Sequence, residues 1–158
     1  RGAEPLPPVS ELAKRAGDAQ RGAEIYFRED AACASCHQVH GKGTDFGPDL
    51  SEIGSKFGKE ALYDAILEPS AGISFGFEAW QIHFKNGDEA FGLIVSETDD
   101  EIALKTQGGI LSRYPKAQID SREKRGTSIM PEGLQAALTA QELVDLVEFL
   151  ASLKTVAR

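Results

Sequence analysis

The sequence predicts a mainly α fold, α+β overall, with an antiparallel β-meander inserted between two helical parts. Apolar residues recur at helical spacing before residue 70 and after residue 139, which predicts amphipathic helices there. From about Phe77 the spacing changes to alternation, which predicts half-buried antiparallel strands. We expect an arm over residues 1–16 and a single domain over residues 17–158, with a β-rich insertion over residues 77–120.

Capping signals and helical spacing predict the first three helices. The start of the chain is rich in proline, which is typical of an arm or a linker. Ser10 is expected to cap a short helix that ends before Gly17, and Asp18 to cap a second helix that runs to about Glu29. A third helix is expected over residues 59–67, where a proline soon follows and ends it.

Thr139 and Glu142 form a capping box that predicts the last helix, which runs to about Leu153. Acidic residues on this helix, which include Asp145 and Glu148, are expected at the surface. The apolar residues that form the buried stripe of this helix are Leu143, Leu146, Val147 and Leu150.

Alternating residues and turn signals predict the meander between these helices. Asn86-Gly87 is a strong signal for a tight hairpin turn between the first two strands. A third strand begins at Ile102, and a fourth, over residues 110–119, is interrupted by Pro115. The alternating apolar residues of the first two strands are Trp80, Ile82, Phe84, Phe91, Leu93 and Val95.

Composition excludes several classes of protein. The chain has 17 Lys and Arg against 25 Asp and Glu, a formal net charge of -8, which argues against a nucleic-acid-binding protein. Its longest apolar stretches are far shorter than the ~20 residues of a membrane-spanning helix, so we expect no membrane span. It has 2 cysteines in 158 residues, which argues against a disulfide-rich mini-protein.

The two cysteines carry the most specific signal in the chain. Cys33, Cys36 and His37 form the pattern C-x-x-C-H, which is the attachment pattern for c-type haem. Two thiols at this spacing reach the two vinyl groups of one porphyrin edge and become thioethers, and the adjacent imidazole becomes the proximal ligand of the iron. We therefore predict one covalently bound haem c at this segment.

Three other interpretations of the cysteine pair carry less weight. A thioredoxin-like redox pair belongs near a βαβ pattern, whereas a helical segment precedes this motif and a glycine-rich loop follows it. A zinc site needs four nitrogen or sulfur ligands, and the whole chain offers 2 Cys and 3 His. A simple disulfide gives no reason for the adjacent histidine.

The second axial ligand of a haem iron decides between electron transfer and ligand chemistry. The single methionine, Met130, lies in a loop before the last helix, where a thioether ligand would raise the reduction potential. The alternative is a core methionine that fills a gap. His40 follows His37 too closely to reach the opposite face of the porphyrin, and His83 lies on the polar face of its strand, so both are expected at the surface.

On these residues the chain resembles a class I c-type cytochrome. The resemblance covers roughly residues 17–155 and rests on Gly22, Tyr26, the C-x-x-C-H motif, Gly47-Pro48-Asp49-Leu50 and Met130-Pro131. The sequence is most similar to the planctomycete/verrucomicrobial haem-binding domain. The strings that carry this closer similarity are Gly47-Pro48-Asp49-Leu50-Ser51, Ala65-Ile66-Leu67-Glu68-Pro69-Ser70 and Ser128-Ile129-Met130-Pro131.

The resemblance implies a mainly α cytochrome c fold, α+β overall because of the inserted meander, and a role for each matching residue. Cys33 and Cys36 would hold one covalent haem c. His37 would be the proximal iron ligand and Met130 the distal one. The Pro48 carbonyl would accept a hydrogen bond from the other ring nitrogen of His37 and so fix the orientation of the ring.

The function that the resemblance implies is single-electron transfer by Fe(III)/Fe(II) cycling rather than catalysis. The partner would be a redox protein or a fused dehydrogenase domain, because similar domains often form the C-terminal part of larger secreted proteins. The alternative is a haem-based sensor or a peroxidase-like domain whose distal position is open or labile. Covalent haem attachment implies a periplasmic or extracytoplasmic location. The chain starts at Arg1 without a signal peptide, so we expect a mature form or an excised domain.

Other residues have expected contacts with the haem or with the last helix. Gly22 would let its helix cross closely against the last helix. The basic segment over residues 122–125 is expected to border the haem or to contact an acidic partner, with a solvated loop as the alternative. Trp80 and Tyr114 are candidates for haem contact, with ordinary packing at least as well supported.

Overall fold

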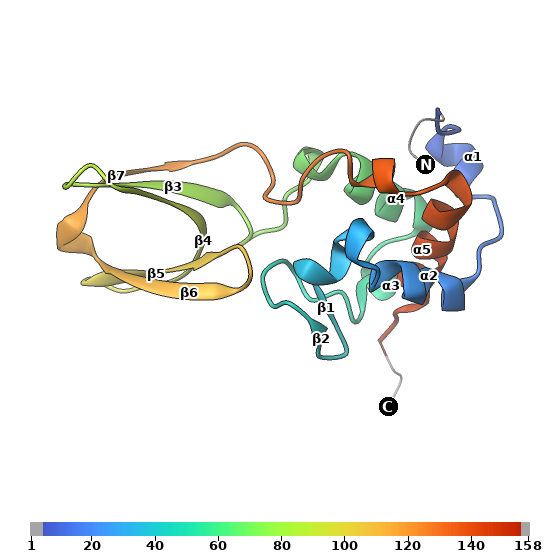
Figure 1. Cartoon of the computed structure of the whole chain (residues 1–158), viewed down its shortest axis with the longest axis horizontal. Coiled ribbons are helices and arrows are strands. Elements are labelled where there is room, and N and C mark those ends of the chain that lie inside the picture. The colour runs from blue at the N-terminus through green and yellow to red at the C-terminus, as the bar shows by residue number, and fades with distance from the viewer. Residues whose placement is uncertain (1–4, 156–158) are drawn as a thin grey trace.

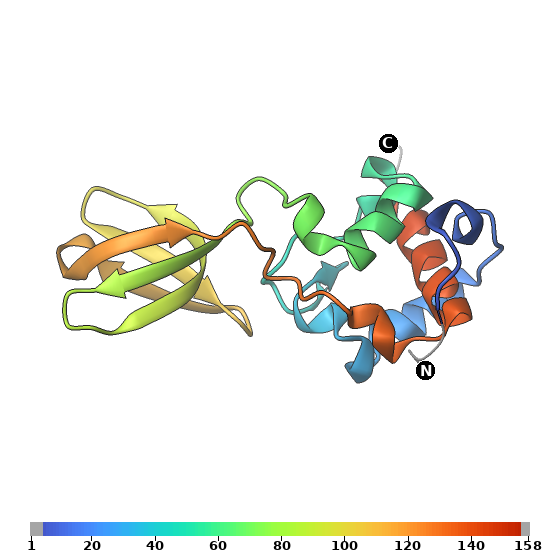
Figure 2. The ribbon, with the colours of Figure 1, turned by 90° about the horizontal axis from the view of Figure 1, so that it is seen from above.

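A computed structural model describes residues 5–155, with helices gathered in one part of the molecule and a five-stranded sheet at the other end (Figure 1; Figure 2). Two connecting segments, residues 72–78 and 125–133, join the sheet to the helical part. Helices and an antiparallel sheet are both present, which confirms the α+β prediction. Residues 1–4 of the predicted arm and 156–158 of the predicted domain lie outside the described residues.

The sheet lies in the chain between the fourth and the fifth α-helix. The predicted fourth strand, residues 110–119, ends already at Pro115, which lacks a backbone N–H. A fifth strand that the sequence analysis does not predict covers residues 119–124 and pairs with the first strand of the sheet. The spatial order is β6-β5-β4-β3-β7, all antiparallel. The strands are β3 (Ala79–Phe84), β4 (Glu89–Glu97), β5 (Glu101–Thr106), β6 (Ile110–Pro115) and β7 (Ile119–Lys124).

The sheet is strongly curled. Its two edge strands, β6 and β7, are joined by the short 3₁₀ turn η4 (Lys116–Gln118), so the opposite edges must lie near each other. Glu97 at the end of β4 reaches towards this junction, because one carboxylate oxygen lies 2.7 Å from Lys116 Nζ and the other 3.0 Å from Arg122 Nη1. The curl encloses a separate small core around Ile82, Ile102 and Leu104.

The register of the first hairpin differs from the expected one. An Asn86-Gly87 two-residue turn would place Phe91 opposite Ile82, whereas Ile82 pairs with Ala90. The loop is one residue longer, because Phe84 N–H donates to Asp88 O and Gly87 takes a φ of 91°. This shift turns the β4 side chains to opposite faces, which leaves Phe91 44 % exposed. Two other predicted residues of β4 then lie away from the sheet core, with Leu93 buried on the other face and Val95 exposed.

The candidates for haem contact in the sheet take part in packing within it. Trp80 packs against the small core, and the Arg122 guanidinium lies 5.2 Å from the centre of its ring. The Phe84 and Tyr114 rings lie 4.8 Å apart. The basic segment therefore begins inside the sheet, in β7, because Arg122 is held by Glu97 and Trp80.

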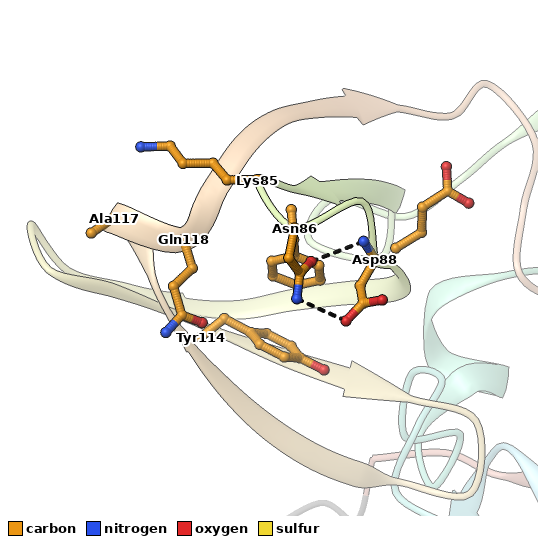
Figure 3. A pocket seen from close by; sticks show the side chains of 8 residues that line it. Lys85, Asn86, Asp88, Tyr114, Ala117 and Gln118 are labelled. Atoms are coloured by element: carbon orange, nitrogen blue, oxygen red, sulfur yellow. Dashed lines mark hydrogen bonds between the residues drawn. The ribbon is translucent and has the colours of Figure 1, made fainter.

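An open groove of about 640 Å³ lies at the end of the sheet farthest from the helical part (Figure 3). Phe84 and Tyr114 line it together with polar residues of the β3–β4 turn. In that turn Asn86 Oδ1 accepts from Asp88 N–H, and Asn86 Nδ2 donates to the Asp88 carboxylate, both at 2.9 Å.

The helical part contains five α-helices among the described residues, and the expected helix over residues 59–67 is confirmed with those bounds. The first helix begins after Pro8 without a side-chain cap, so Ser10 does not cap it. Asp18 does cap the second, by accepting from the backbone N–H of Gln20 and of Arg21. The helices are α1 (Val9–Leu12), α2 (Ala19–Tyr26), α3 (Ile53–Lys56), α4 (Lys59–Leu67) and α5 (Ala140–Ser152).

Short elements that sequence periodicity does not reveal fill the rest of the helical part. A two-stranded hairpin, β1 (Gln38–Val39) and β2 (Lys42–Gly43), lies in the expected loop. The 3₁₀ turns are η1 (Glu29–Ala31), η2 (Cys33–Ser35), η3 (Pro69–Ala71) and η5 (Leu134–Ala137). No helix in the described part of the chain is long and apolar enough to cross a membrane.

Helices α2 and α5 cross at very close range. A Cβ at Gly22 would lie 1.9 Å from Asp145 O, so only glycine allows this approach. The core around the crossing contains Tyr26, Leu143, Leu146 and Val147, which are buried. Leu12 of α1 joins the same core, and its carbonyl accepts from the Tyr63 hydroxyl of α4 at 3.3 Å.

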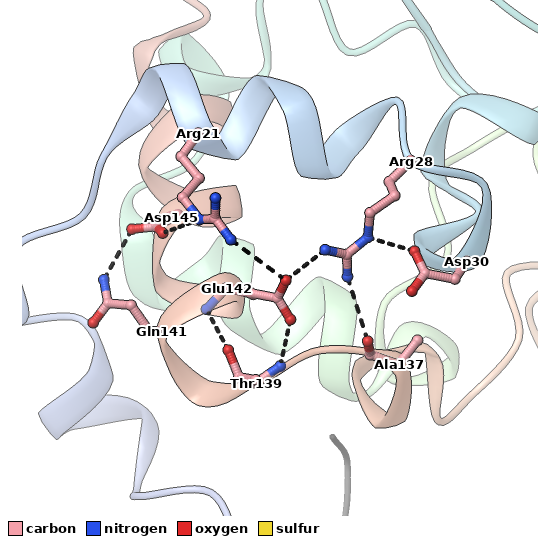
Figure 4. A network of polar contacts seen from close by, with 8 residues as sticks. All are labelled: Arg21, Arg28, Asp30, Ala137, Thr139, Gln141, Glu142 and Asp145. Atoms are coloured by element: carbon pink, nitrogen blue, oxygen red, sulfur yellow. Dashed lines mark hydrogen bonds and ion pairs between the residues drawn. The ribbon is translucent and has the colours of Figure 1, made fainter.

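Two acids of α5 are buried, which corrects the expectation that they lie at the surface. Glu142 is 4 % exposed and Asp145 is 2 % exposed. Figure 4 shows Arg21 and Arg28 of the first half of the chain pointing at these carboxylates. Asp145 also accepts from Asp18 N–H at 2.9 Å. Burial is tolerated because each carboxylate has charged or hydrogen-bonding partners.

Candidate functional site

The C-x-x-C-H segment begins directly after the turn that follows α2. Ala32 takes a left-handed conformation with a φ of 62° and reverses the chain into η2, which holds Cys33. His37 N–H and Cys36 N–H both donate to Cys33 O, at 3.0 and 3.2 Å. This tight turn fixes the backbone spacing of the two cysteines and the histidine.

Both cysteines are free thiols and half-buried. Cys33 Sγ lies 3.6 Å from Ala31 O, and Cys36 Sγ lies 3.9 Å from Ser35 Oγ. Burial raises the pKa of the Cys33 thiol to about 11, because a thiolate is poorly stabilised in apolar surroundings. In the protein without haem, Cys33 is therefore a neutral thiol at physiological pH.

His37 is fixed by one short hydrogen bond. Its Nδ1 lies 2.7 Å from Pro48 O. A carbonyl oxygen only accepts, so Nδ1 carries the proton and Nε2 keeps a lone pair. Burial lowers the pKa of His37, opposed by this hydrogen bond, so the ring is neutral at physiological pH. A neutral imidazole with a free Nε2 is the form that binds a metal ion.

The loop after the motif folds back over it. Gly47 N–H donates to Cys36 O at 2.6 Å, and Thr44 N–H donates to Ala34 O at 2.9 Å. A Cβ at Gly47 would lie 2.7 Å from His37 Cε1, so the backbone of this loop lies directly against the imidazole ring. The loop thus supplies both the Pro48 carbonyl and one wall of the ring.

Tyr26 at the end of α2 supports the histidine from the other direction. Its hydroxyl donates to His37 O at 2.9 Å. The side chain is fully buried, and burial raises the pKa of its hydroxyl above the usual range. The hydroxyl therefore remains a neutral donor, and it ties the motif to the crossing of α2 and α5.

Met130 is half-buried in the second connecting segment. Its side chain packs against the helical core. Cys33 and Leu50, which come from the first third of the chain, pack against the same core. Its backbone N–H donates to Ser128 Oγ at 3.1 Å, and Ser128 N–H donates to Ser70 Oγ at 2.9 Å. The structure thus brings the predicted methionine and the predicted haem-attachment segment to one core.

Of the other two histidines, His40 lies at the surface as expected, whereas His83 is half-buried. His40 is exposed, and its backbone N–H donates to Ser51 Oγ. His83 lies on β3 with its Nδ1 3.0 Å from Glu89 Oε1.

The donor set of this site fits a covalently held haem. Two free thiols stand at the required spacing, and the neighbouring imidazole presents a free Nε2. A thioether from Met130 packs on the same core. Among the described residues, Gln135 Oε1 is a buried polar atom without a hydrogen-bond partner, and it lies in η5 just after the methionine loop.

Comparison with known protein families shows the family of the chain. A family model for cytochrome c matches residues 19–104, which is more than half of the chain. The chain belongs to the cytochrome c family. The match contains the whole C-x-x-C-H motif and ends within β5, and no curated protein matches the chain.

Membership in this family confirms the resemblance to a c-type cytochrome. Cytochrome c proteins bind haem c covalently and transfer electrons to and from a redox partner, and their domains are typically extracytoplasmic. The thioredoxin-like, zinc and disulfide interpretations of the cysteine pair therefore lose their support.

Several residues of the site have roles that sequence reasoning does not assign. Gly47 belongs to a string that carries the resemblance, yet its contact with the His37 ring depends on loop geometry. Tyr26 is another such residue, because nothing in the spacing predicts its bond to the His37 carbonyl. Ser70 and Ser128 lie 58 residues apart in the chain, so nothing in the sequence predicts that Ser128 N–H donates to Ser70 Oγ.

Proposed function

We propose that this cytochrome c is a monohaem electron carrier with His37 and Met130 as axial ligands. Cys33 and Cys36 would hold the haem by thioethers. Haem c supplies, when bound, an iron that alternates between the ferric and ferrous states. The protein's part is to attach the macrocycle, fix both ligands and keep water from the site.

The observation that carries the proposal is the fixed state of His37. Its Nδ1 is 2.7 Å from Pro48 O, and the Gly47 backbone packs on its ring. An imidazole held in one tautomer and one orientation is a preorganised ligand, because hydrogen bonding at one nitrogen directs the other towards the metal. Little has to move when the oxidation state changes, as electron transfer requires.

Packing and hydrogen bonds support Met130 as the second ligand. The residue is half-buried against the core that Cys33 also contacts, and its backbone is tied to Ser128. A thioether favours the ferrous state and raises the potential. Such a ligand suits an electron carrier better than an open sensor or peroxidase site.

The wider assignments are part of the same proposal. One C-x-x-C-H motif in a chain with 2 cysteines supports one haem. The planctomycete/verrucomicrobial type is also part of the proposal, and the three sequence strings that resemble that type support it. We propose a periplasmic protein, free or as the relay module of a larger secreted one, in which the sheet is an insertion between haem attachment and methionine.

Maturation tests the attachment. The chain should be expressed in a periplasm that attaches haem, and its mass measured after acid extraction of non-covalent haem. We expect the mass of one haem to remain on the wild-type protein and on Met130→Ala, and to be absent from the double variant Cys33→Ala/Cys36→Ala. A wild-type protein that loses all haem on extraction would contradict the proposal.

Redox titration and ligand binding test the function. We expect a reversible one-electron transition and slow binding of carbon monoxide to the ferrous protein, because His37 and Met130 would both hold the iron. In Met130→Ala the potential should fall and carbon monoxide should bind at once. A wild-type protein that is five-coordinate and binds carbon monoxide as fast as Met130→Ala would favour the haem sensor or peroxidase instead.

A further inference from the structure

Two serines join the backbone of Met130 to the end of the helical part. Ser128 Oγ accepts from Met130 N–H at 3.1 Å, and Ser70 Oγ accepts from Ser128 N–H at 2.9 Å. Both serines are half-buried. The two bonds run in series from the methionine to η3, 58 residues earlier in the chain than Ser128.

The η3 turn, which holds Ser70, is attached to the helical core by more contacts than the loop that holds Met130. Pro69 is buried, and Ala71 N–H donates to Glu68 O at the end of α4, whose Leu62 and Ile66 lie in the helical core. By contrast, residues 125–133 contain no helix or strand. Among residues 5–155, the hydrogen bonds described for the stretch 126–132 are these two. Besides the packing of the Met130 side chain on the helical core, these two hydrogen bonds are what hold the backbone of the loop.

We propose that Ser70 is a positioning residue for Met130, which acts through Ser128 and holds the thioether where the distal ligand is required. The proposal rests on the ligand role proposed above for Met130. According to this proposal, Ser70, which lies outside the haem-attachment segment, determines the fraction of molecules in which Met130 is displaced from the iron.

The place of this bond gives it a second role. Ser70 lies in η3, just before the connecting segment 72–78 that leads to β3, and Ser128 lies within the segment 125–133 that returns from β7, so their bond ties the returning segment to the helical part near the start of the outgoing one. The sheet also contacts the helical part elsewhere, where Lys105 Nζ lies 3.2 Å from Asp45 Oδ2, but the hydrogen bonds described for the methionine loop run through Ser70 and Ser128. Loss of the Ser70 hydroxyl frees the loop, and the fraction of molecules with a displaced methionine rises.

The size of the effect follows from the net strength of one neutral hydrogen bond. Losing such a bond shifts an equilibrium between held and displaced loop by about three- to tenfold. An external ligand such as imidazole binds the ferric protein only from the displaced state, so its observed binding rate rises by the same factor.

The test compares four variants of the full-length protein with covalent haem. Ser70→Ala removes the anchor, Ser128→Ala removes the second bond alone, and Ser70→Thr keeps the hydroxyl. Ser55→Ala is the matched control, because Ser55 Oγ also accepts a backbone N–H, from Thr155 at 2.6 Å. The readouts are the ferric far-red band of methionine ligation, the imidazole binding rate, and hydrogen exchange of the Ser128 and Met130 amides.

We expect Ser70→Ala and Ser128→Ala to bind imidazole about three- to tenfold faster than the wild type and to weaken the far-red band. Ser70→Thr and Ser55→Ala should behave as the wild type. Equal rates in Ser70→Ala and Ser55→Ala, with the band intact in both, would overturn the positioning role while Met130 ligation stands. A wild-type protein without the far-red band would instead overturn Met130 ligation and the role of Ser70 with it.

Discussion

Three contacts fix His37, the proposed proximal ligand of the iron. The Pro48 carbonyl fixes the tautomer, the Tyr26 hydroxyl holds the His37 carbonyl, and Gly47 lies against the ring. Each contact acts at a different atom of one residue. Removal of one contact should therefore move the imidazole without releasing the covalent haem.

Gly47→Ala tests this support directly. The new Cβ would lie 2.7 Å from His37 Cε1, so either the ring or the loop must shift. We expect the holoprotein to keep its haem, but with a higher potential and a lower thermal midpoint, because an imidazole pushed away from its hydrogen bond with Pro48 is a less basic ligand and stabilises ferric iron less. The measurements are a redox titration and thermal unfolding followed in the haem absorption.

Gly126→Ala is the matched control, because a Cβ there meets nothing within 4 Å and its φ needs no glycine. It should leave both quantities unchanged. If Gly47→Ala also leaves both unchanged, the loop is looser than the contact distance implies.

Much of the site at the residue scale follows from the sequence alone. The motif predicts Cys33, Cys36 and His37, because the chemistry requires those residue types at that spacing. The sequence does not predict that Glu142 is buried, because an acid on an amphipathic helix is normally at the surface. Its burial depends on Arg28, which is far away in the chain.

At the scale of elements, the crossing of α2 and α5 supports the haem-attachment segment, since α2 ends at Tyr26. The crossing depends on Gly22, where a Cβ would lie 1.9 Å from Asp145 O. Gly22→Ala must therefore separate the two helices. We expect a loss of about 3 kcal/mol in the free energy of unfolding, which lowers the thermal midpoint by about 10 °C.

Calorimetry of the holoprotein measures this loss, with Gly126→Ala again as the control. A midpoint for Gly22→Ala within about 2 °C of the wild type, which corresponds to well under 1 kcal/mol, would contradict the close crossing.

The ion pairs of Glu97 with Lys116 and Arg122 make the stability of the sheet depend on pH. Hydrogen bonds from Lys116 and then Arg122 lower the pKa of Glu97 to about 2. A lowered pKa stabilises the fold above the unfolded-state value of about 4.5, and this contribution disappears as the pH falls towards 2. Glu97→Gln should therefore lower the thermal midpoint near neutral pH and have little effect at the acid end.

Glu123→Gln is the control for the acid experiment. Glu123 is an exposed acid of β7, and among the described residues no ion pair is recorded for it. It should not change the midpoint at either pH. If Glu97→Gln lowered the thermal midpoint equally at neutral and at acid pH, the ion pairs of Glu97 would not be what stabilises the sheet.

The sequence predicts where helices begin better than it predicts the register and the order in which strands pair. Capping residues gave the starts of α2 and α5, because a cap is a local contact. The face of β4 was predicted wrongly, because a hairpin loop longer by one residue turns every side chain over. The return of β7 to β3 was not predictable, since the curl of the sheet depends on contacts between distant strands.

At the scale of the whole molecule, charge should govern electron exchange. The formal net charge of -8 attracts cationic reagents and repels anionic ones. We expect reduction by a hexaammineruthenium complex to slow as the ionic strength rises from about 0.01 M to about 0.1 M, and reduction by ferrocyanide to quicken. Stopped-flow kinetics measures both rates. The opposite pair of trends would show that a local basic surface, such as residues 122–125, governs the approach instead.

The ferric absorption spectrum of the haem-loaded wild type beside that of Met130→Ala tests the central claim, His37/Met130 ligation in an electron carrier, most directly. We predict a low-spin spectrum with a weak far-red band in the wild type, and loss of that band with intact covalent haem in Met130→Ala. Identical ligand spectra for the two proteins, or a high-spin wild-type spectrum, would contradict the account.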